Sequence, residues 1–221
     1  MPRTWVVIPM YNEGSVVEGV VRDVRAAFPH VVCVDDGSSD ESVAAARRGG
    51  AVVVQHPINM GQGAALQTGF DYALSDPLMT DVVTFDADGQ HQVADALGMV
   101  EKLRAEDLDV VIGSRFLDDR TEVARLRRVV LKTAAVYTRW TTGMALTDAH
   151  NGLRVVGRPL LERLRLRQNR MAHASELVDQ IGRADARWAE YPTHIIYTDY
   201  SKAKGQSLLN SVNILFELIF R

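Results

Sequence analysis

Short apolar runs alternate with longer amphipathic segments along the first half of the chain. The runs are continuously apolar, which is typical of strands buried on both faces of a sheet. The segments between them place apolar residues at helical spacing, as in the stretch 16–28. Because runs and segments alternate with short connections, we predict an α/β fold with a mostly parallel central sheet flanked by helices. The predicted strands are 5–8, 31–34, 51–54, 81–85 and 110–112.

The pattern changes after Arg115. We expect a basic helix over 120–142, a short strand beginning at Arg154 and a helix that Glu176 opens and that ends near residue 186. Further elements are two edge strands at 188–192 and 194–198 and a closing amphipathic helix at 208–220. Such a closing helix packs on the core, pairs with a second copy in a homodimer, or lies on a membrane surface.

Composition narrows the class of protein without identifying its function. The 221 residues are enough for one domain with a substantial core. The formal net charge of -3 gives no overall attraction to nucleic acid. The single cysteine, Cys33, excludes a disulfide framework, which fits a reducing compartment. We find no apolar leader and no apolar run of roughly 20 residues. We therefore expect a cytoplasmic protein, with the closing helix as a means of binding the inner face of a membrane.

Carboxylates stand where predicted strands end. Asp86 and Asp88 follow the strand at 81–85, and Asp36 follows another strand in the same way. The carboxyl ends of strands in an open α/β sheet are where ligands usually bind. Oxygen ligands from Asp86, Asp88 and Gln90 suit a hard divalent ion, Mg²⁺ or Mn²⁺. The alternative is a simple turn, because aspartate and glycine are good turn formers.

A glycine-rich segment, residues 59–64, leads into a predicted helix. Its glycines, Gly63 among them, would let the backbone approach a ligand closely at the helix N-terminus. The segment is not the dinucleotide-binding turn, which would follow the first strand, and it lacks the lysine of a phosphate-binding P-loop.

Basic residues gather in the second half of the chain. A run of charges on a helix is usually a solvated face, but such a cluster also attracts an anionic partner. The two runs consist of Arg125, Arg127, Arg128, Lys132 and Arg139, and of Arg163, Arg165, Arg167 and Arg170.

Five motifs, taken in order, resemble family 2 glycosyltransferases, and most closely the dolichyl-phosphate mannose synthase-like branch. The resemblance is strong over residues 5–115 and looser through 151–154, Glu176 and 204–207. It implies a GT-A fold in which 1–221 is a single domain, with a nucleotide-sugar-binding half at 1–115 and an acceptor half at 116–221. The motifs are residues 9–13 (PMYNE), 35–38 (DDGS), 59–64 (NMGQGA), 86–91 (DADGQH) and 113–115 (GSR).

The resemblance also implies how a nucleotide-sugar donor is held. Pro9, Tyr11 and Glu13 would flank the nucleoside, and Asp36 would read the base or ribose. Asp86 would hold the ribose or the metal. Asp88 and Gln90 would ligate Mg²⁺ or Mn²⁺ on the diphosphate. From the sequence alone, Glu13 is equally a first-turn acid that the helix dipole favours.

The expected chemistry is transfer of a hexose with inversion, from a donor of the GDP-mannose or UDP-glucose type. A divalent ion stabilises the negative charge that develops on the leaving diphosphate. Arg115, Lys202 or Lys204 would add to that stabilisation. We expect polyprenyl phosphate as the acceptor, because the second half is basic and the closing helix amphipathic.

The kind of acceptor decides which further residues are needed. A phosphate is already a nucleophile at neutral pH, and Arg115 and Arg154 would bind it through their guanidinium forks. A soluble or glycan hydroxyl needs a carboxylate to take its proton, for which Asp148 and Glu176 are the candidates.

Some features depart from the family branch or leave other functions open. Gln92 and Val93 stand where proline is usual after residues 90–91, and His150 stands where cysteine is common. No membrane-spanning helices are expected. A sugar-phosphate nucleotidyltransferase would also use carboxylate-bound Mg²⁺, but residues 9–13 stand where its glycine-rich loop belongs. A non-catalytic nucleotide-binding module is the third alternative.

Overall fold

The structure, a computed structural model, describes residues 3–118, 120–121, 125–170 and 172–196. The predicted closing helix at 208–220 lies outside the described residues, as do Lys202 and Lys204. What was predicted for them stays a prediction.

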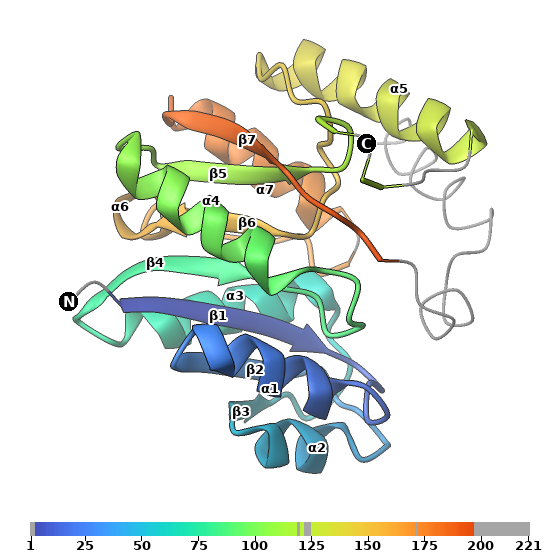
Figure 1. The fold of residues 1–221 in the computed structure, drawn as a ribbon, viewed down its shortest axis with the longest axis vertical. Coiled ribbons are helices and arrows are strands. Elements are labelled where there is room, and N and C mark those ends of the chain that lie inside the picture. Colours follow the sequence, from blue (N-terminus) through green and yellow to red (C-terminus); the bar gives the residue numbers. More distant parts are fainter. Residues whose placement is uncertain (1–2, 119, 122–124, 171, 197–221) are drawn as a thin grey trace.

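Within the described residues, seven strands form one sheet in the order β3-β2-β1-β4-β6-β5-β7. All neighbouring strands run parallel except β6, which is antiparallel to both β4 and β5. The prediction of a mostly parallel sheet is therefore confirmed. The strands are β1 (Arg3–Met10), β2 (His30–Asp35), β3 (Val52–Gln55), β4 (Met79–Thr84), β5 (Val110–Ser114), β6 (Arg154–Gly157) and β7 (Trp188–Pro192) (Figure 1).

Helices cover both faces of this sheet. Val6 and Ile8 of β1 pack with α1, α2 and α4 on one face, and Trp5 and Val7 pack with α3, α6 and α7 on the other. Because both faces are covered, successive residues of β1 from Trp5 to Ile8 are apolar although they point to opposite faces of the sheet. The helices are α1 (Val17–Ala27), α2 (Ser42–Gly49), α3 (Gln62–Leu74), α4 (Val93–Ala105), α5 (Arg125–Thr142), α6 (Arg158–Leu161) and α7 (His173–Arg183).

Three predicted elements of the second half differ from the structure. The helix predicted over 120–142 is wrong for residues 120–121, and α5 spans Arg125–Thr142. The helix expected to open at Glu176 begins at His173, so Glu176 lies in the first turn of α7. The edge strand at 188–192 is confirmed as β7, but the strand predicted from residue 194 is wrong for 194–196. The reason lies in where the N–H groups of those residues donate. Asp95 Oδ2, Thr121 Oγ1 and the Gln90 carbonyl accept them, none of which belongs to a neighbouring strand.

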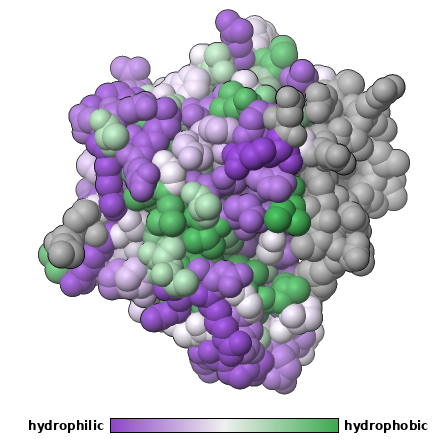
Figure 2. Space-filling view, in the orientation of Figure 1, coloured by the Kyte–Doolittle hydropathy of each residue, from purple (hydrophilic) through white to green (hydrophobic). Residues whose placement is uncertain are grey.

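The outer surface seen in Figure 2 is mostly hydrophilic, with apolar side chains gathered near the middle of this face. Among the described helices, none combines the length and apolar character that crossing a membrane requires.

Gly69 marks a close contact between α3 and the sheet. A Cβ built on Gly69 would lie 2.2 Å from Val7 Cγ1, whereas one built on Gly19 in α1 would meet nothing within 4 Å. We expect Gly69→Ala to lower the free energy of unfolding by about 1–3 kcal/mol through overpacking. Gly19→Ala should raise it by up to about 1 kcal/mol, because alanine is the better helix former. Urea unfolding of both variants measures the contrast, and equal effects would contradict the packing described here.

Candidate active site

A cavity of about 790 Å³ opens at the carboxyl ends of β1, β2 and β4. Six of the residues predicted to bind the donor or the metal line this cavity. Arg170, from the second half of the chain, lines it as well. Gln90 and Gly63 are not among the described lining residues. The cavity is lined by Pro9, Met10, Tyr11, Glu13, Asp36, Asn59, Gly61, Gln62, Ala65, Asp86, Ala87, Asp88 and Arg170.

Asp36 fixes the loop that forms one wall of this cavity. Its Oδ1 accepts a hydrogen bond from Met60 N (2.9 Å) and its Oδ2 accepts one from Gly61 N (2.7 Å). His56 Nδ1 lies 2.8 Å from Asp36 Oδ1, and His56 Nε2 lies 2.9 Å from Thr68 Oγ1. Gly61 has φ of 102°, a conformation that favours glycine. Asp36 thus shapes the wall, and its predicted contact with a base or ribose stays a prediction. Sequence reasoning did not find His56.

Asp86 is held from several sides. His91 Nε2 lies 2.8 Å from its Oδ2, and Gln62 Nε2 donates to its Oδ1 at 3.4 Å. The backbone of Gly152 approaches so closely that an added Cβ would lie 2.4 Å from Asp86 Oδ2. Burial raises the pKa of Asp86, but the charge and hydrogen bond of His91, together with the charges of Arg154 and His173, outweigh burial and hold this pKa below its usual value. Asp86 is therefore a fixed carboxylate.

Asp88 has the opposite electrostatic environment. Burial, followed by the nearby charge of Asp86, raises the pKa of Asp88 to about 6. Gln90 donates to it from its backbone N (3.1 Å) and its Nε2 (2.8 Å). Negative charge is thus concentrated between Asp86 and Asp88, where a cation would be favourable.

These residues fit a hard divalent ion. Among the described residues no three His, Cys, Asp or Glu side chains are grouped as a metal site. Mg²⁺, however, is commonly bound by one or two carboxylates together with substrate phosphates. Asp86 and Asp88 supply two carboxylates, and both face a cavity large enough for such a substrate. As a ligand, Gln90 would contribute its Oε1.

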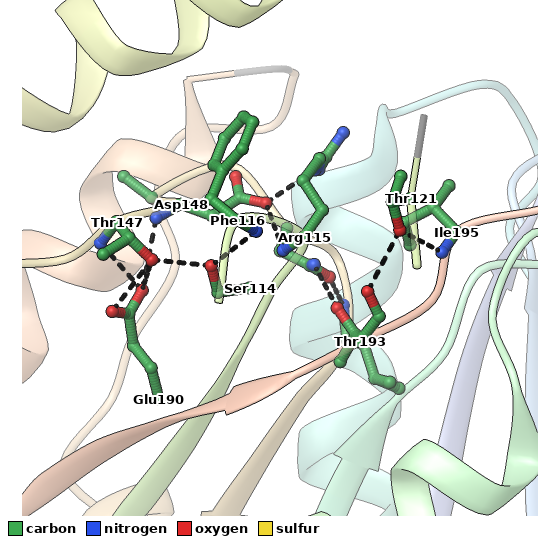
Figure 3. A network of polar contacts seen from close by, with 12 residues as sticks. Ser114, Arg115, Phe116, Thr121, Thr147, Asp148, Glu190, Thr193 and Ile195 are labelled. Atoms are coloured by element: carbon green, nitrogen blue, oxygen red, sulfur yellow. Dashed lines mark hydrogen bonds and ion pairs between the residues drawn. The ribbon is translucent and has the colours of Figure 1, made fainter. Parts of the chain in front are cut away.

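Two of the residues predicted to act on the acceptor, Arg115 and Asp148, lie in a buried polar network at the end of β5 (Figure 3). Arg115 Nε donates to Asp148 Oδ2 at 2.6 Å, and Arg115 N donates to the same oxygen at 3.2 Å. Arg115 is 7% exposed and Asp148 is fully buried. Glu190 of β7 accepts bonds from the backbone N of Thr147 and Asp148 at 2.8 and 3.2 Å, and its burial raises its pKa. The network fixes Asp148 beside Arg115.

The structure places the Arg154 side chain inside the protein, and its predicted contact with an acceptor phosphate stays a prediction. The side chain is 1% exposed, and its Nη2 donates to the Ala149 carbonyl at 3.4 Å. Burial lowers the pKa of Arg154 to about 10, and the charges of Asp86 and Asp148 oppose that shift. The positive charge of the buried guanidinium compensates the negative charges of Asp86 and Asp148 inside the protein.

Glu176 and Gly63 both contact the backbone that follows α6. Glu176 Oε2 accepts hydrogen bonds from Arg167 N (2.9 Å) and Gln168 N (2.8 Å). Gly63 N donates to the Asn169 carbonyl at 2.8 Å. The glycine-rich segment was expected to approach a ligand closely. In the structure, Gly63 closely approaches the protein's own backbone at Asn169.

Comparison with known proteins identifies the class to which this fold and cavity belong. A model described as Glycosyl transferase family 2 matches residues 5–164. The chain therefore belongs to family 2 of the glycosyltransferases and is an enzyme of that class. The predicted resemblance is confirmed.

Two of the curated relatives with named activities are similar to this chain as follows. A UDP-N-acetylglucosamine–dolichyl-phosphate N-acetylglucosaminyltransferase of Methanococcus voltae is 26% identical, over 97% of this chain and 94% of the relative. A polyprenol monophosphomannose synthase of Mycolicibacterium smegmatis is 34% identical, over 74% of this chain and 65% of the relative.

Solved structures establish the GT-A fold. Glucosyl-3-phosphoglycerate synthase from Mycobacterium tuberculosis, in complex with Mn²⁺ and UDP-glucose, superimposes with a TM-score of 0.72. The identity is 20%, and the match covers 99% of this chain and 78% of that chain.

Proposed function

We propose that this glycosyltransferase moves a hexose with inversion from a nucleotide-diphosphate sugar to a polyprenyl phosphate, with Mg²⁺ or Mn²⁺ as cofactor. The observation that carries the proposal is the cavity that brings Asp86 and Asp88 together with Tyr11 and Glu13. Both named relatives add sugars to polyprenyl-type phosphates. The fold neighbour was solved with Mn²⁺ and UDP-glucose.

In this proposal the first half of the chain holds the donor. Pro9, Tyr11 and Glu13 flank the nucleoside, while Asp86, Asp88 and Gln90 hold the divalent ion. The ion would supply charge stabilisation for the departing diphosphate. Asp86 is well suited to this role, because His91 and Gly152 fix its carboxylate before any ligand arrives.

The candidate bases favour a phosphate acceptor over a hydroxyl. Asp148 is fully buried and paired with Arg115, and Glu176 is bound to two backbone N–H groups. Neither lines the cavity as far as the described residues define it. A hydroxyl acceptor requires a base within hydrogen-bond reach, whereas an acceptor phosphate attacks without one.

The outward face of α5 is suited to a membrane surface, where such an acceptor would be found. Trp140 is 84% exposed and Val136 is 69% exposed, one helical turn apart. Lys132 and Arg139 are exposed beside them. An aromatic and aliphatic stripe with flanking cations is typical of helices that lie in the interface of anionic bilayers. We therefore propose peripheral membrane association at the inner face. The expected homodimer and the single-domain organisation of 1–221 stay predictions.

An assay of sugar transfer to a lipid acceptor, with and without the divalent metal ion, tests the proposal. The purified protein is incubated with GDP-mannose, UDP-glucose or UDP-N-acetylglucosamine and detergent-solubilised polyprenyl phosphate, with Mn²⁺. We expect a lipid-linked sugar and free nucleoside diphosphate, both abolished by EDTA and restored by excess Mn²⁺. Transfer that persists under chelation would contradict the metal's role. Pyrophosphate release from a nucleoside triphosphate and a sugar phosphate would instead identify a nucleotidyltransferase.

A further inference from the structure

Residues 165–170, here called the 165–170 segment, have no regular secondary structure, yet their backbone is held throughout. Side chains of α3 and α7 bind four consecutive residues of the segment, so its path is fixed without helix or strand hydrogen bonds. The bonds run from Arg165 N to Gln180 Oε1 (2.8 Å), from Gln180 Nε2 to Arg165 O (2.7 Å), from Leu166 N to Gln67 Oε1 (2.7 Å), and from Arg167 N and Gln168 N to Glu176 Oε2 (2.9 and 2.8 Å).

The 165–170 segment crosses directly over the N-terminus of α3. A Cβ built on Gly61 would lie 2.1 Å from the Asn169 carbonyl oxygen, and one built on Gly63 would lie 2.1 Å from that of Gln168. No side chain larger than hydrogen fits at either position. The contact joins the second half of the chain to the wall of the cavity.

This contact delivers Arg170 to the cavity. The Arg170 carbonyl accepts from His173 N at 3.0 Å and lies 2.7 Å from His173 Nδ1, which fixes the end of the segment. Arg170 Cγ would lie 3.3 Å from a Cβ on Gly61, so the stem of the side chain runs along the cavity wall. Arg170 is the cavity's one lysine or arginine among the described lining residues, whereas Glu13, Asp36, Asp86 and Asp88 are acids.

We infer that Arg170 binds a phosphate of the nucleotide-diphosphate sugar. The inference rests on the proposed function and adds a donor-binding residue from the second half of the chain. A diphosphate entering a cavity lined by four carboxylates needs positive charge from the protein as well as from a metal ion. A guanidinium offers paired N–H donors that match phosphate oxygens, and it stays charged at any working pH. Glu176 acts through Arg170 as a positioning residue, because it holds the segment that carries the arginine.

Binding of nucleotides of increasing phosphate content tests the assignment. Isothermal titration calorimetry in the presence of Mn²⁺ measures the binding of uridine, UMP and UDP, and of guanosine, GMP and GDP. The proteins compared are wild type, Arg170→Ala and Arg167→Ala. Arg167 is a matched control, since it is exposed, lies in the same segment and does not line the cavity. We expect Arg170→Ala to weaken diphosphate binding about 10- to 100-fold, as for the loss of one charge-assisted contact, and to leave nucleoside binding unchanged. Arg167→Ala should match wild type.

Glu176→Ala tests the positioning role. We expect it to weaken diphosphate binding and to have no further effect when Arg170 is already alanine, because both changes remove the same contact. Nucleoside binding by Glu176→Ala should stay at the wild-type value, which a general loss of structure would not allow. Additive effects in the double variant would overturn the link between the two residues.

The outcomes separate this inference from the function on which it rests. If wild type binds diphosphates and Arg170→Ala binds them equally well, the inference is wrong and the proposed function stands. An equal loss for nucleoside and diphosphate would also overturn it, because Arg170 would then contact the nucleoside. If wild type binds neither UDP nor GDP in the presence of Mn²⁺, both are wrong.

Discussion

Replacing Asp88 by asparagine is expected to reduce sugar transfer by about 1,000-fold or more while leaving the protein folded. A bound metal ion contributes several kcal/mol of charge stabilisation to the transition state, and each 1.36 kcal/mol is a factor of ten in rate. Asparagine keeps the shape of Asp88 but removes the charge that would attract the ion. Initial rates with saturating donor and Mn²⁺ measure the loss.

The fold of this variant should be intact for an electrostatic reason. Burial and the charge of Asp86 already raise the pKa of Asp88 to about 6, so an ionised Asp88 is unfavourable in the metal-free protein. Asp88→Asn should therefore show a melting temperature equal to or above that of wild type without metal, and a smaller rise on adding Mn²⁺ and nucleotide. Asp23→Asn, on the exposed side of α1, is the matched control and should keep full activity. An active Asp88→Asn enzyme would remove the basis of the proposed metal site.

Hydrophobic patterning was enough to predict the sheet because its strands are buried on both faces. Val6 and Val7 are each fully buried, one on either side of the sheet, and burial on both faces produces a continuous apolar run. The antiparallel direction of β6 was not predictable in this way. Its four residues pair with β4 and β5, which are distant in the sequence. A short apolar run does not indicate which strands it will pair with or in which direction.

In the candidate site, too, residues at strand ends were predictable from the sequence, whereas residues brought in by contacts between distant segments were not. Asp86 and Asp88 were found because the carboxyl ends of parallel strands meet at one edge of the sheet, and Tyr11 was found through the family resemblance. His56 was not found, and Arg170 was seen only as part of a basic run, because contacts between distant segments bring His56 to Asp36 and Arg170 to the cavity wall. The burial of Arg154 was not predictable, because an arginine in a polar loop looks the same in the sequence whether solvent or buried carboxylates surround it. Only the proximity of Asp86 and Asp148 distinguishes the two cases.

The buried pair of Asp148 and Arg115 allows a second strong prediction, this time for stability. We expect Asp148→Ala to lower the free energy of unfolding by about 3–5 kcal/mol, because it removes the buried carboxylate that accepts from the buried Arg115 guanidinium. The matched control is Asp179→Ala, which breaks an exposed pair with Arg183 on α7 and should cost no more than about 0.5 kcal/mol. Urea unfolding of both variants measures the difference.

Two further variants decide what Asp148 is for. Asp148→Ala combined with Arg115→Met should recover part of the lost stability, because an apolar replacement of a buried ion pair often costs little. Asp148→Asn keeps an oxygen that can accept from the Arg115 N–H groups, and it should unfold at a urea concentration between those of wild type and Asp148→Ala. Near-normal stability together with complete loss of transfer in Asp148→Asn would contradict a structural role. Asp148 would then be the general base, the acceptor would be a hydroxyl, and the proposal of a phosphate acceptor would be wrong.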